Sequence, residues 1–233
     1  YEITNRLVGS EMCIRRQNKN TTQPKKTMLK SQSINFSYDG THQFSFPDIQ
    51  LSKGDDLLVL GQSGVGKTTL LQILAGLLKP SSGLLEFNGV QFHNLSPKEL
   101  DRFRGKHIGI VFQSPYFVKN ISILDNLLLS LYLSKNKENK RAVELLEQVG
   151  LGHKINSKPN DLSQGEQQRA AIALAVVKNP SVILADEPTS SLDDVNCKKI
   201  TSLLKEQAAS TKAQLIIITH DQRLKAQFNK SIT

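Results

Sequence analysis

The chain has 233 residues, of which 38% are hydrophobic and 22% are charged, and its formal net charge is +9. This size and balance predict a globular protein of one domain, or of one domain with a substantial insertion. The sequence has no stretch of about 18 uninterrupted apolar residues, so no membrane span is predicted. A charge this mildly basic suits phosphates, anionic lipid or plain solvation, and no direct nucleic-acid partner is expected. The two cysteines, Cys13 and Cys197, lack metal-ligand spacing, which indicates a reduced cytosolic protein without a structural metal.

The first 27 residues are polar, with six Lys or Arg against two Glu and little hydrophobic periodicity. We expect a disordered tail here, because no apolar core follows the charges as a signal peptide requires. Our hypothesis is that the native chain starts at Met28 and that residues 1–27 are a non-native or tag-like extension.

The next segments alternate in polarity as strands do, over residues 33–38 and 44–51. Residues 56–60 form a short apolar strand that leads into residues 61–68. This loop fits the pattern G-x-x-x-x-G-K-[ST] at every required position, and a helix is expected over residues 67–78.

The spacing of this loop suits anion binding. Glycines let backbone N–H groups turn inward, and the helix N-terminus adds a partial positive charge. Lys67 can then reach the β- and γ-phosphates of a nucleotide, and the Thr68 hydroxyl can ligate Mg²⁺. The residues predicted to contact the phosphates are Gly61, Gln62, Ser63, Gly64, Val65, Gly66, Lys67, Thr68 and Thr69.

Beyond this helix the pattern continues to alternate between strand and helix. Asn88-Gly89 predicts a hairpin after a strand over residues 84–87, and Ser96-Pro97 predicts a helix that runs to about residue 105. An apolar run over residues 108–112 is typical of a buried strand and leads directly to Gln113.

The second half of the chain begins with a helical stretch over residues 121–158. Ser163 and Glu166 form a capping-box pattern at the start of a helix over residues 163–178. Further expected elements are a strand at 181–185, helices at 195–208 and 222–229, and a strand at 215–218; another strand would begin at 231. This order predicts a three-layer α/β domain with a helical insertion at about 114–162.

Polar residues follow three of the predicted buried strands. Asp186 and Glu187 come directly after one, where Asp186 would hold Mg²⁺ and Glu187 would take a proton from the attacking water or orient it. His220 and Gln113 follow two others, and suit a γ-phosphate contact and a ligand to Mg²⁺ or water, respectively. Taken singly, each of these residues has an ordinary structural explanation.

Residues 162–169, LSQGEQQR, place a serine hydroxyl, a glycine and exposed N–H groups at a helix N-terminus. This is a possible second anion site, which makes sense if two copies pair head to tail and each closes over the nucleotide of the other. A well-capped helix without a ligand is the alternative.

These motifs, in this order and spacing, resemble those of the ATP-binding subunit of ABC transporters over residues 28–233. The resemblance identifies 61–68 as Walker A, Gln113 as the Q-loop residue, 162–166 as the signature, Asp186 as the end of Walker B and His220 as the H-loop residue. It implies a P-loop NTPase three-layer fold with an antiparallel β subdomain and an inserted α-helical subdomain. The implied reaction is ATP hydrolysis coupled to transport, with ATP and Mg²⁺ as cofactors.

The resemblance also assigns further residues. Tyr38 would stack on adenine, with Phe36 as the alternative, and Asp193 belongs to the D-loop at 190–193. Glu187, His220 and Gln113 would be catalytic, and Thr68, Gln113 and Asp186 would hold the metal. Ser163, Gln164, Gly165 and Glu166 would contact the nucleotide held by a second copy.

The chain departs from the family pattern at four positions. Gln164 and Glu166 replace a commoner glycine and glutamine, and Ser191 replaces alanine, changes that leave the predicted function intact. Leu174 stands where the family often has arginine, which puts an ionic contact of that helix in doubt.

Three segments, LSQGEQQRAAIALA, ILADEPTSSLD and FRGKHIGIVFQ, resemble the small cassettes of lipoprotein-release and macrolide-export complexes and the related cell-division cassette. The implied partners are a second copy and an integral membrane permease, whose coupling helix would lie in a groove lined by residues 121–133. The implied location is the cytoplasmic face of the inner membrane. The alternatives are a cell-division ATPase that transmits force without cargo and a non-transport protein acting on ribosomes or DNA.

Overall fold

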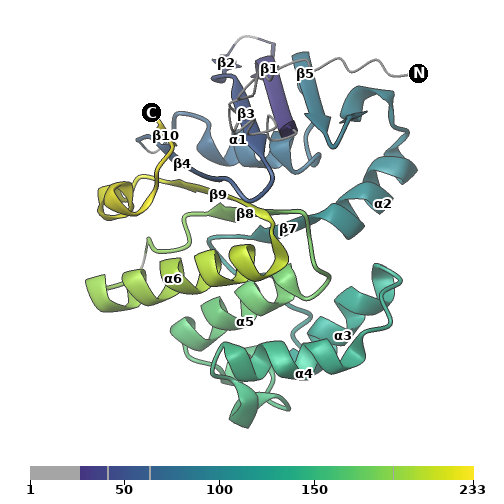
Figure 1. Ribbon diagram of the computed structural model, residues 1–233, viewed down its shortest axis with the longest axis vertical. Helices are drawn as coiled ribbons and strands as arrows, with labels where there is room; N and C mark the ends of the chain where they lie inside the picture. The colour runs from purple at the N-terminus through teal and green to yellow at the C-terminus, as the bar shows by residue number, and fades with distance from the viewer. Residues whose placement is uncertain (1–26, 41, 63, 191) are drawn as a thin grey trace, which may run out of the picture.

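The computed structural model describes residues 27–40, 42–62, 64–190 and 192–233. Almost all of the predicted tail 1–27 therefore lies outside the described residues, as do Ser63 and Ser191. Within the described ranges the strands form two five-stranded sheets, one antiparallel and one parallel, with helices between and below them (Figure 1).

The antiparallel sheet is built around the long strand β1. Its members are β1 (Thr27–Ser37), β2 (Gln43–Ser45), β3 (Ile49–Ser52), β5 (Ser82–Phe87) and β6 (Val90–Gln91). Both β2 and β3 pair with β1, where a single strand over residues 44–51 was predicted. Pro47 separates them, because proline has no N–H to donate to a ladder. The hairpin predicted at Asn88-Gly89 is confirmed and joins β5 to β6.

The parallel sheet carries the candidate site at its carboxyl edge. It contains β4 (Asp56–Leu60), β7 (Ile108–Val111), β8 (Val182–Asp186), β9 (Gln214–Thr219) and β10 (Ser231–Ile232). The order is β10-β4-β9-β8-β7, and all four neighbouring pairs are parallel. The ends of β4, β8 and β9 therefore meet at one edge, as the sequence predicted.

Successive side chains of the buried strands point to opposite faces of the parallel sheet and pack in two hydrophobic cores. Val182 and Leu184 of β8 pack on the side of α1 (Lys67–Leu74), which lies between the two sheets. Ile183 and Ala185 pack on the opposite side, against the layer of α3 to α6. The remaining helices are α2 (Pro97–His107), α3 (Ile123–Leu133), α4 (Asn139–Gln148), α5 (Gln164–Val176) and α6 (Asp194–Thr211), with 3₁₀ turns η1 (Phe92–Asn94), η2 (Gly152–Lys154), η3 (Pro159–Asp161) and η4 (Gln222–Gln227).

The fold class is confirmed: the described chain is a three-layer α/β domain with an antiparallel sheet above and helices below (Figure 1). Helices α3 and α4 lie between β7 and α5, within the predicted insertion at about 114–162, whose exact bounds stay a prediction. The final helix predicted at 222–229 is instead the 3₁₀ turn η4, because the chain must extend again by Ser231 to pair with β4.

Helix α5 approaches β7 so closely that only glycine fits between them. A Cβ added to Gly109 would lie 2.4 Å from the carbonyl oxygen of Ala175, well inside van der Waals contact. Interiors pack too densely to absorb such an overlap, so Gly109 fixes the distance between α5 and the parallel sheet.

Candidate active site

The phosphate-loop backbone has the shape that its glycines predict. Gly64 and Gly66 adopt φ of 86° and 90°, the left-handed region that other residues avoid. Gly66 is also required sterically, since a Cβ there would lie 2.7 Å from Cδ1 of Phe44. It caps α1, whose first N–H groups are left for a ligand rather than for a side-chain cap.

Lys67 is held inside the loop by three oxygen atoms. Its Nζ donates to the carbonyl oxygens of Gly61 and Gln62, both at 2.8 Å, and lies 3.5 Å from Oε1 of Glu187. The side chain is only 9% exposed. An incoming phosphate would therefore compete with oxygen atoms that already contact this cation.

Asp186, at the end of β8, is buried and only partly satisfied. The Thr68 hydroxyl is a hydrogen-bond partner of its carboxyl group, and Oδ1 is buried without a partner among the described residues. Burial raises the pKa of Asp186, and the bond to Thr68 opposes that rise. A buried, unpaired carboxylate oxygen beside a hydroxyl is a donor set that fits Mg²⁺.

The Glu187 carboxylate accepts hydrogen bonds from residues at and just after the end of β9. Thr219 Oγ1 donates to its Oε2 at 2.7 Å, and the His220 backbone N–H and Nδ1 lie 3.1 and 2.9 Å from Oε1. Burial on its own raises the pKa of Glu187, but the hydrogen bonds from His220 and Thr219 outweigh it and hold the pKa below its ordinary value. The carboxylate is thus ionised at neutral pH, as a general base requires.

Glu187 also has φ of 47°, unusual for a residue with a side chain. Its backbone N–H donates to the carbonyl of Ile218 at 2.8 Å, which helps to hold this conformation. Because strained backbone tends to gather at functional sites, the turn is a further reason to single out this residue.

Gln113 reaches the same edge from β7. Its Nε2 donates to Oγ of Ser190 at 3.3 Å, and Ser190 lies three residues after Glu187 in the chain. A hollow of about 320 Å³ lies here, lined by Phe44, Gly64, Gly66, Lys67, Thr68, Thr69, Gln113, Glu187 and His220. Most of the residues predicted from three separate strand ends therefore line one cavity.

Tyr38 lies beside the loop rather than in the core. Its hydroxyl is 3.0 Å from Oγ1 of Thr69, its ring meets Phe36 edge to face with centroids 4.7 Å apart, and 64% of the residue is exposed. Phe36 is buried, so Tyr38 is the ring free to stack on a base.

The predicted capping box at the start of α5 is confirmed. The backbone N–H and the hydroxyl of Ser163 both donate to Oε2 of Glu166 at 2.8 Å, and these bonds lower the pKa of Glu166. Ser163 and Gly165 do not line the 320 Å³ hollow formed by the described residues. The structure therefore does not bring the two predicted anion sites together within one chain.

Asp193 has a structural role that sequence reasoning did not assign. Its side chain caps α6 by accepting from the backbone N–H and the side-chain amide of Asn196, both at 2.8 Å. These bonds lower the pKa of Asp193. Its predicted contact with a nucleotide remains a prediction.

Asp221 and Arg223 form a clamp that the sequence analysis missed. Arg223 donates to both oxygens of the buried Asp221, at 2.8 and 2.7 Å, and to Oδ1 of Asp194 at 2.6 Å. It also donates to the carbonyl of Leu192 at 3.3 Å, so it joins the D-loop to the segment that carries His220. The sequence contained one signal for this clamp, namely an aspartate directly after His220 and an arginine two residues after that aspartate.

Together, the doubly wound parallel sheet and the loop, carboxylates and histidine at its edge define a P-loop ATPase. Comparison with known proteins narrows this further: residues 46–190 match the family described as "ABC transporter". The chain belongs to the ABC transporter family, and is one of its ATP-binding ATPase cassettes.

The relatives agree over most of the chain. The lipoprotein-releasing system ATP-binding protein LolD of Legionella pneumophila (strain Paris) is 38% identical over 211 residues, 87% of this chain and 92% of the relative. LolD of Bacteroides thetaiotaomicron is 36% identical, covering 84% of this chain and 92% of the relative.

Solved structures agree as well. A dimeric bacterial ABC transporter cassette is 32% identical with a TM-score of 0.79, covering 88% of this chain and 93% of that one. A dimeric post-hydrolysis state of such a cassette, bound to ADP and Pi, is 34% identical with a TM-score of 0.74, covering 83% and 88%.

Proposed function

We propose that this ATPase works as a homodimer with two composite Mg-ATP sites and drives an integral membrane permease supplied by other chains. The observation that carries the proposal is the separation of the two anion sites. Lys67 and Glu187 line the nucleotide hollow, whereas Ser163 at the start of α5 lies outside it. A second copy can supply this serine, and the dimeric cassettes among the solved relatives support that arrangement.

In this proposal the phosphate loop, 61–69, binds the triphosphate through its backbone and Lys67. Lys67 exchanges the carbonyl oxygens of Gly61 and Gln62, and part of its contact with Glu187, for phosphate oxygens. Glu187 is then released toward an attacking water and can accept its proton, since its carboxylate is ionised at neutral pH. His220 and Gln113 position the γ-phosphate and that water.

Thr68, Gln113 and Asp186 would hold Mg²⁺; Thr68 and Gln113 line the hollow, and the Thr68 hydroxyl is bonded to the Asp186 carboxyl group. The ion, when bound, neutralises charge that develops on the phosphates. The unpaired Oδ1 of Asp186 supports this assignment, since an ion at that position would satisfy a buried oxygen that the described chain leaves without a partner.

Tyr38 would stack on adenine from its exposed position beside Thr69. Across the dimer, Ser163, Gln164, Gly165 and Glu166 would meet the γ-phosphate, and Asp193 would lie near the same interface. The Ser163 hydroxyl must then turn from Glu166 to the phosphate, because one hydroxyl proton cannot serve two acceptors.

The membrane partner is proposed from the relatives. None of the helices in the described ranges has both the length and the hydrophobicity to cross a bilayer. The lipoprotein-releasing relatives favour a partner permease of that class and a peripheral position on the cytoplasmic face of the inner membrane. Nothing in the comparisons favours the cell-division or the ribosome- and DNA-directed alternatives.

A complementation experiment tests the composite site. Lys67→Ala and Ser163→Ala chains are each expected to lose nearly all turnover, because every site of either homodimer is defective. In a mixture, heterodimers contain one site with both changes and one intact site, so part of the wild-type ATPase rate should return. If mixing restores nothing while the proteins still exchange subunits, Ser163 does not act across a dimer.

A single variant tests the proposed base. Glu187→Gln keeps the size of the side chain but removes the proton acceptor, so turnover should stop while ATP binding persists. Light scattering should then show an ATP-dependent dimer that the wild type forms only transiently. Full ATPase activity in this variant would refute the role of Glu187.

A further inference from the structure

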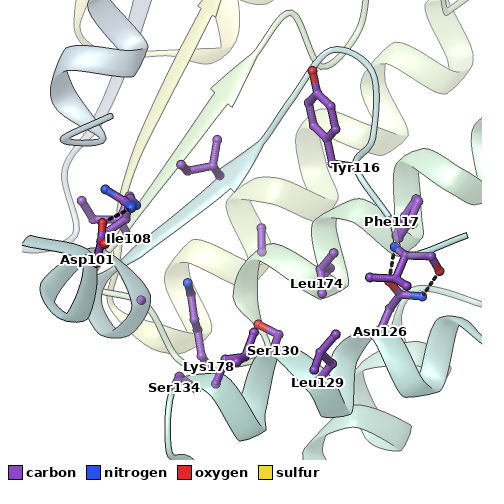
Figure 2. A pocket seen from close by; sticks show the side chains of 16 residues that line it. Asp101, Ile108, Tyr116, Phe117, Asn126, Leu129, Ser130, Ser134, Leu174 and Lys178 are labelled. Carbon is purple, nitrogen blue, oxygen red and sulfur yellow. Dashed lines mark hydrogen bonds and ion pairs between the residues drawn. The ribbon is translucent and has the colours of Figure 1, made fainter. Parts of the chain in front are cut away.

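A groove of about 680 Å³ opens beside β7, the edge strand of the parallel sheet (Figure 2), and its described lining shares no residue with that of the nucleotide hollow. It is bounded by α2, β7, the segment 116–118, α3 and the end of α5. Its lining residues are Asp101, Arg104, Gly105, Ile108, Ile110, Tyr116, Phe117, Val118, Asn126, Leu129, Ser130, Leu133, Ser134, Leu174, Ala175 and Lys178. The segment 116–118 begins three residues after Gln113, so the groove is joined to the active site by a few residues of backbone.

The rim of this groove exposes large apolar side chains. Tyr116 is 73% exposed, Leu133 is 71% exposed, and Val118 and Leu129 are exposed as well. Exposed apolar groups gathered around one hollow are typical of surfaces that bind another macromolecule. Residues of α3 were predicted to line such a groove, and Leu129 and Leu133 do so.

One charge in the groove has no counterpart. Lys178 extends from the end of α5 into the pocket, between Asp101 and Leu174 (Figure 2). Among the described lining residues Asp101 is the acidic one, and its carboxylate is taken by Arg104 at 2.5 Å. In the part of the chain that the structure describes, the Lys178 ammonium has neither an ion pair nor a hydrogen bond, and Arg104 adds a second positive charge nearby.

The electrostatics of Lys178 agree with this geometry. Burial, and to a smaller extent the charge of Arg104, lower the pKa of Lys178 to about 8. A half-buried cation of this kind is destabilised until an anion approaches it. Leu174, one turn earlier on α5, is uncharged, so the positive charge of this groove comes from Lys178 and Arg104.

We propose that the helical segment of the membrane partner expected in this groove carries a carboxylate that pairs with Lys178. The inference rests on the proposed permease partner and adds the chemistry by which that partner is chosen. A helix about 10 Å wide occupies roughly 500 Å³ per turn, so the groove accommodates between one and two turns. The apolar rim would cover the rest of the segment, as in other helix-in-groove complexes.

Binding of the partner supplies the first test. The membrane subunit that co-purifies with the tagged wild-type chain is identified by mass spectrometry, placed in nanodiscs and titrated with variants of the full chain. Lys178→Met should weaken binding about tenfold and Lys178→Glu more, because a pair at a partly buried site is lost or made repulsive. Lys140→Glu, an exposed change outside the groove with the same charge difference, is the matched control and should bind like the wild type.

The pH dependence provides a readout that lost packing alone would not change. The charged and titratable groups facing Lys178 are Asp101 and Arg104 of α2 and Tyr116 of the segment after β7, while α3 contributes uncharged residues to the lining. Affinity of the wild type should be full below about pH 8 and should fall above it as Lys178 loses its proton. Lys178→Arg, which keeps its charge, should bind without that fall.

The outcomes separate the two proposals. If wild type and Lys178→Glu bind the membrane subunit equally, the role of Lys178 is wrong while the permease partner stands. If the wild-type chain binds no membrane subunit, or only a second copy of itself, both are overturned. The strongest support would be a Glu→Lys or Asp→Lys change in the cytoplasmic segment of the partner that restores binding of Lys178→Glu, with the ATPase rate of the isolated variant equal to that of the wild type.

Discussion

The nucleotide hollow and the groove at the end of α5 each contain a partly buried lysine, but the two lysines differ in what surrounds them. Lys67 donates to the loop carbonyls and pairs with Glu187, so this cation has partners even without a ligand. Lys178 meets another cation and no free carboxylate among the described residues that line its groove. The first site exchanges internal contacts for a substrate, whereas the second is completed only from outside.

The largest expected effect separates the two lysines directly. Lys67→Ala should weaken ATP binding by about 100-fold or more, because the loop loses its one charged contact to the phosphates. Lys178→Ala should leave ATP affinity unchanged in the isolated chain. Equilibrium binding of a fluorescent ATP analogue measures both, and equal losses in the two variants would contradict the comparison.

Substitutions of two glycines compare how tightly the backbone is packed in the two regions. Gly66→Ala combines a φ of 90° with a Cβ only 2.7 Å from Phe44, and should destabilise the fold by about 2–3 kcal/mol. Gly105→Ala, in the helical wall of the groove with open space around it, should stabilise the fold by about 0.5–1 kcal/mol. Urea unfolding measures both, and a loss of stability in Gly105→Ala would show that the groove wall has no room for a methyl group.

The clamp formed by Asp221 and Arg223 predicts an effect of intermediate size. Arg223→Ala should cost about 1–2 kcal/mol of stability and should lower the ATPase rate through the D-loop, with Arg223→Lys recovering part of the loss. Hydrogen bonds from Arg223 lower the pKa of Asp221 to about 2.

The sign of the pH effect follows from that shift. An aspartate titrates near 3.9 in the unfolded chain, so the clamp stabilises the fold above about pH 4. Its contribution is lost as the pH falls from about 4 toward 2. In Arg223→Ala the unfolding free energy should therefore depend less on pH in this window than in the wild type, which acid titration of stability measures.

The smallest expected effect on ATP affinity is at Tyr38, the exposed ring proposed to stack on the base. Tyr38→Phe keeps the ring and removes the hydroxyl bond to Thr69, so ATP affinity should change less than twofold, while Tyr38→Ala should weaken it by roughly three- to tenfold. Phe36→Leu is the control for a change in the core beneath. A greater loss of ATP affinity in the control would place the base on Phe36.

Much of the nucleotide site could be predicted because its residues follow strand ends. Parallel strands place Lys67, Asp186 and His220 at one edge whatever the loops between them do. The capping box at Ser163 was likewise local, and could be predicted from residues three positions apart. Pro47 divides the strand predicted over residues 44–51 into β2 and β3. This proline was visible in the sequence, but the alternating pattern of polarity outweighed it in the prediction.

Features that depend on distant contacts could not be predicted. Arg223 joins Asp221 to Leu192 and Asp194, about 30 residues away in the chain, and nothing local marks that pairing. Lys178 could not be distinguished from any surface lysine, because the residues around it come from α2, β7 and α3, and its missing partner is a property of the assembled groove. The last turn, η4, was predicted as a helix. The residues after it form β10 and pair with β4, a strand far away in sequence, and nothing local indicates that pairing.

One helix connects the two regions. Ser163 caps the start of α5, and Lys178 follows two residues after its end at Val176, so about 22 Å of nearly continuous helix separates them at 1.5 Å per residue. Gly109 holds this helix against β7 near Ala175. A tilt of about 5° about that contact would move Ser163, about 18 Å away, by about 1.6 Å, enough to make or break a hydrogen bond. The length and the anchoring of α5 therefore make it a lever, in which a small rotation about Ala175 becomes a larger displacement at Ser163.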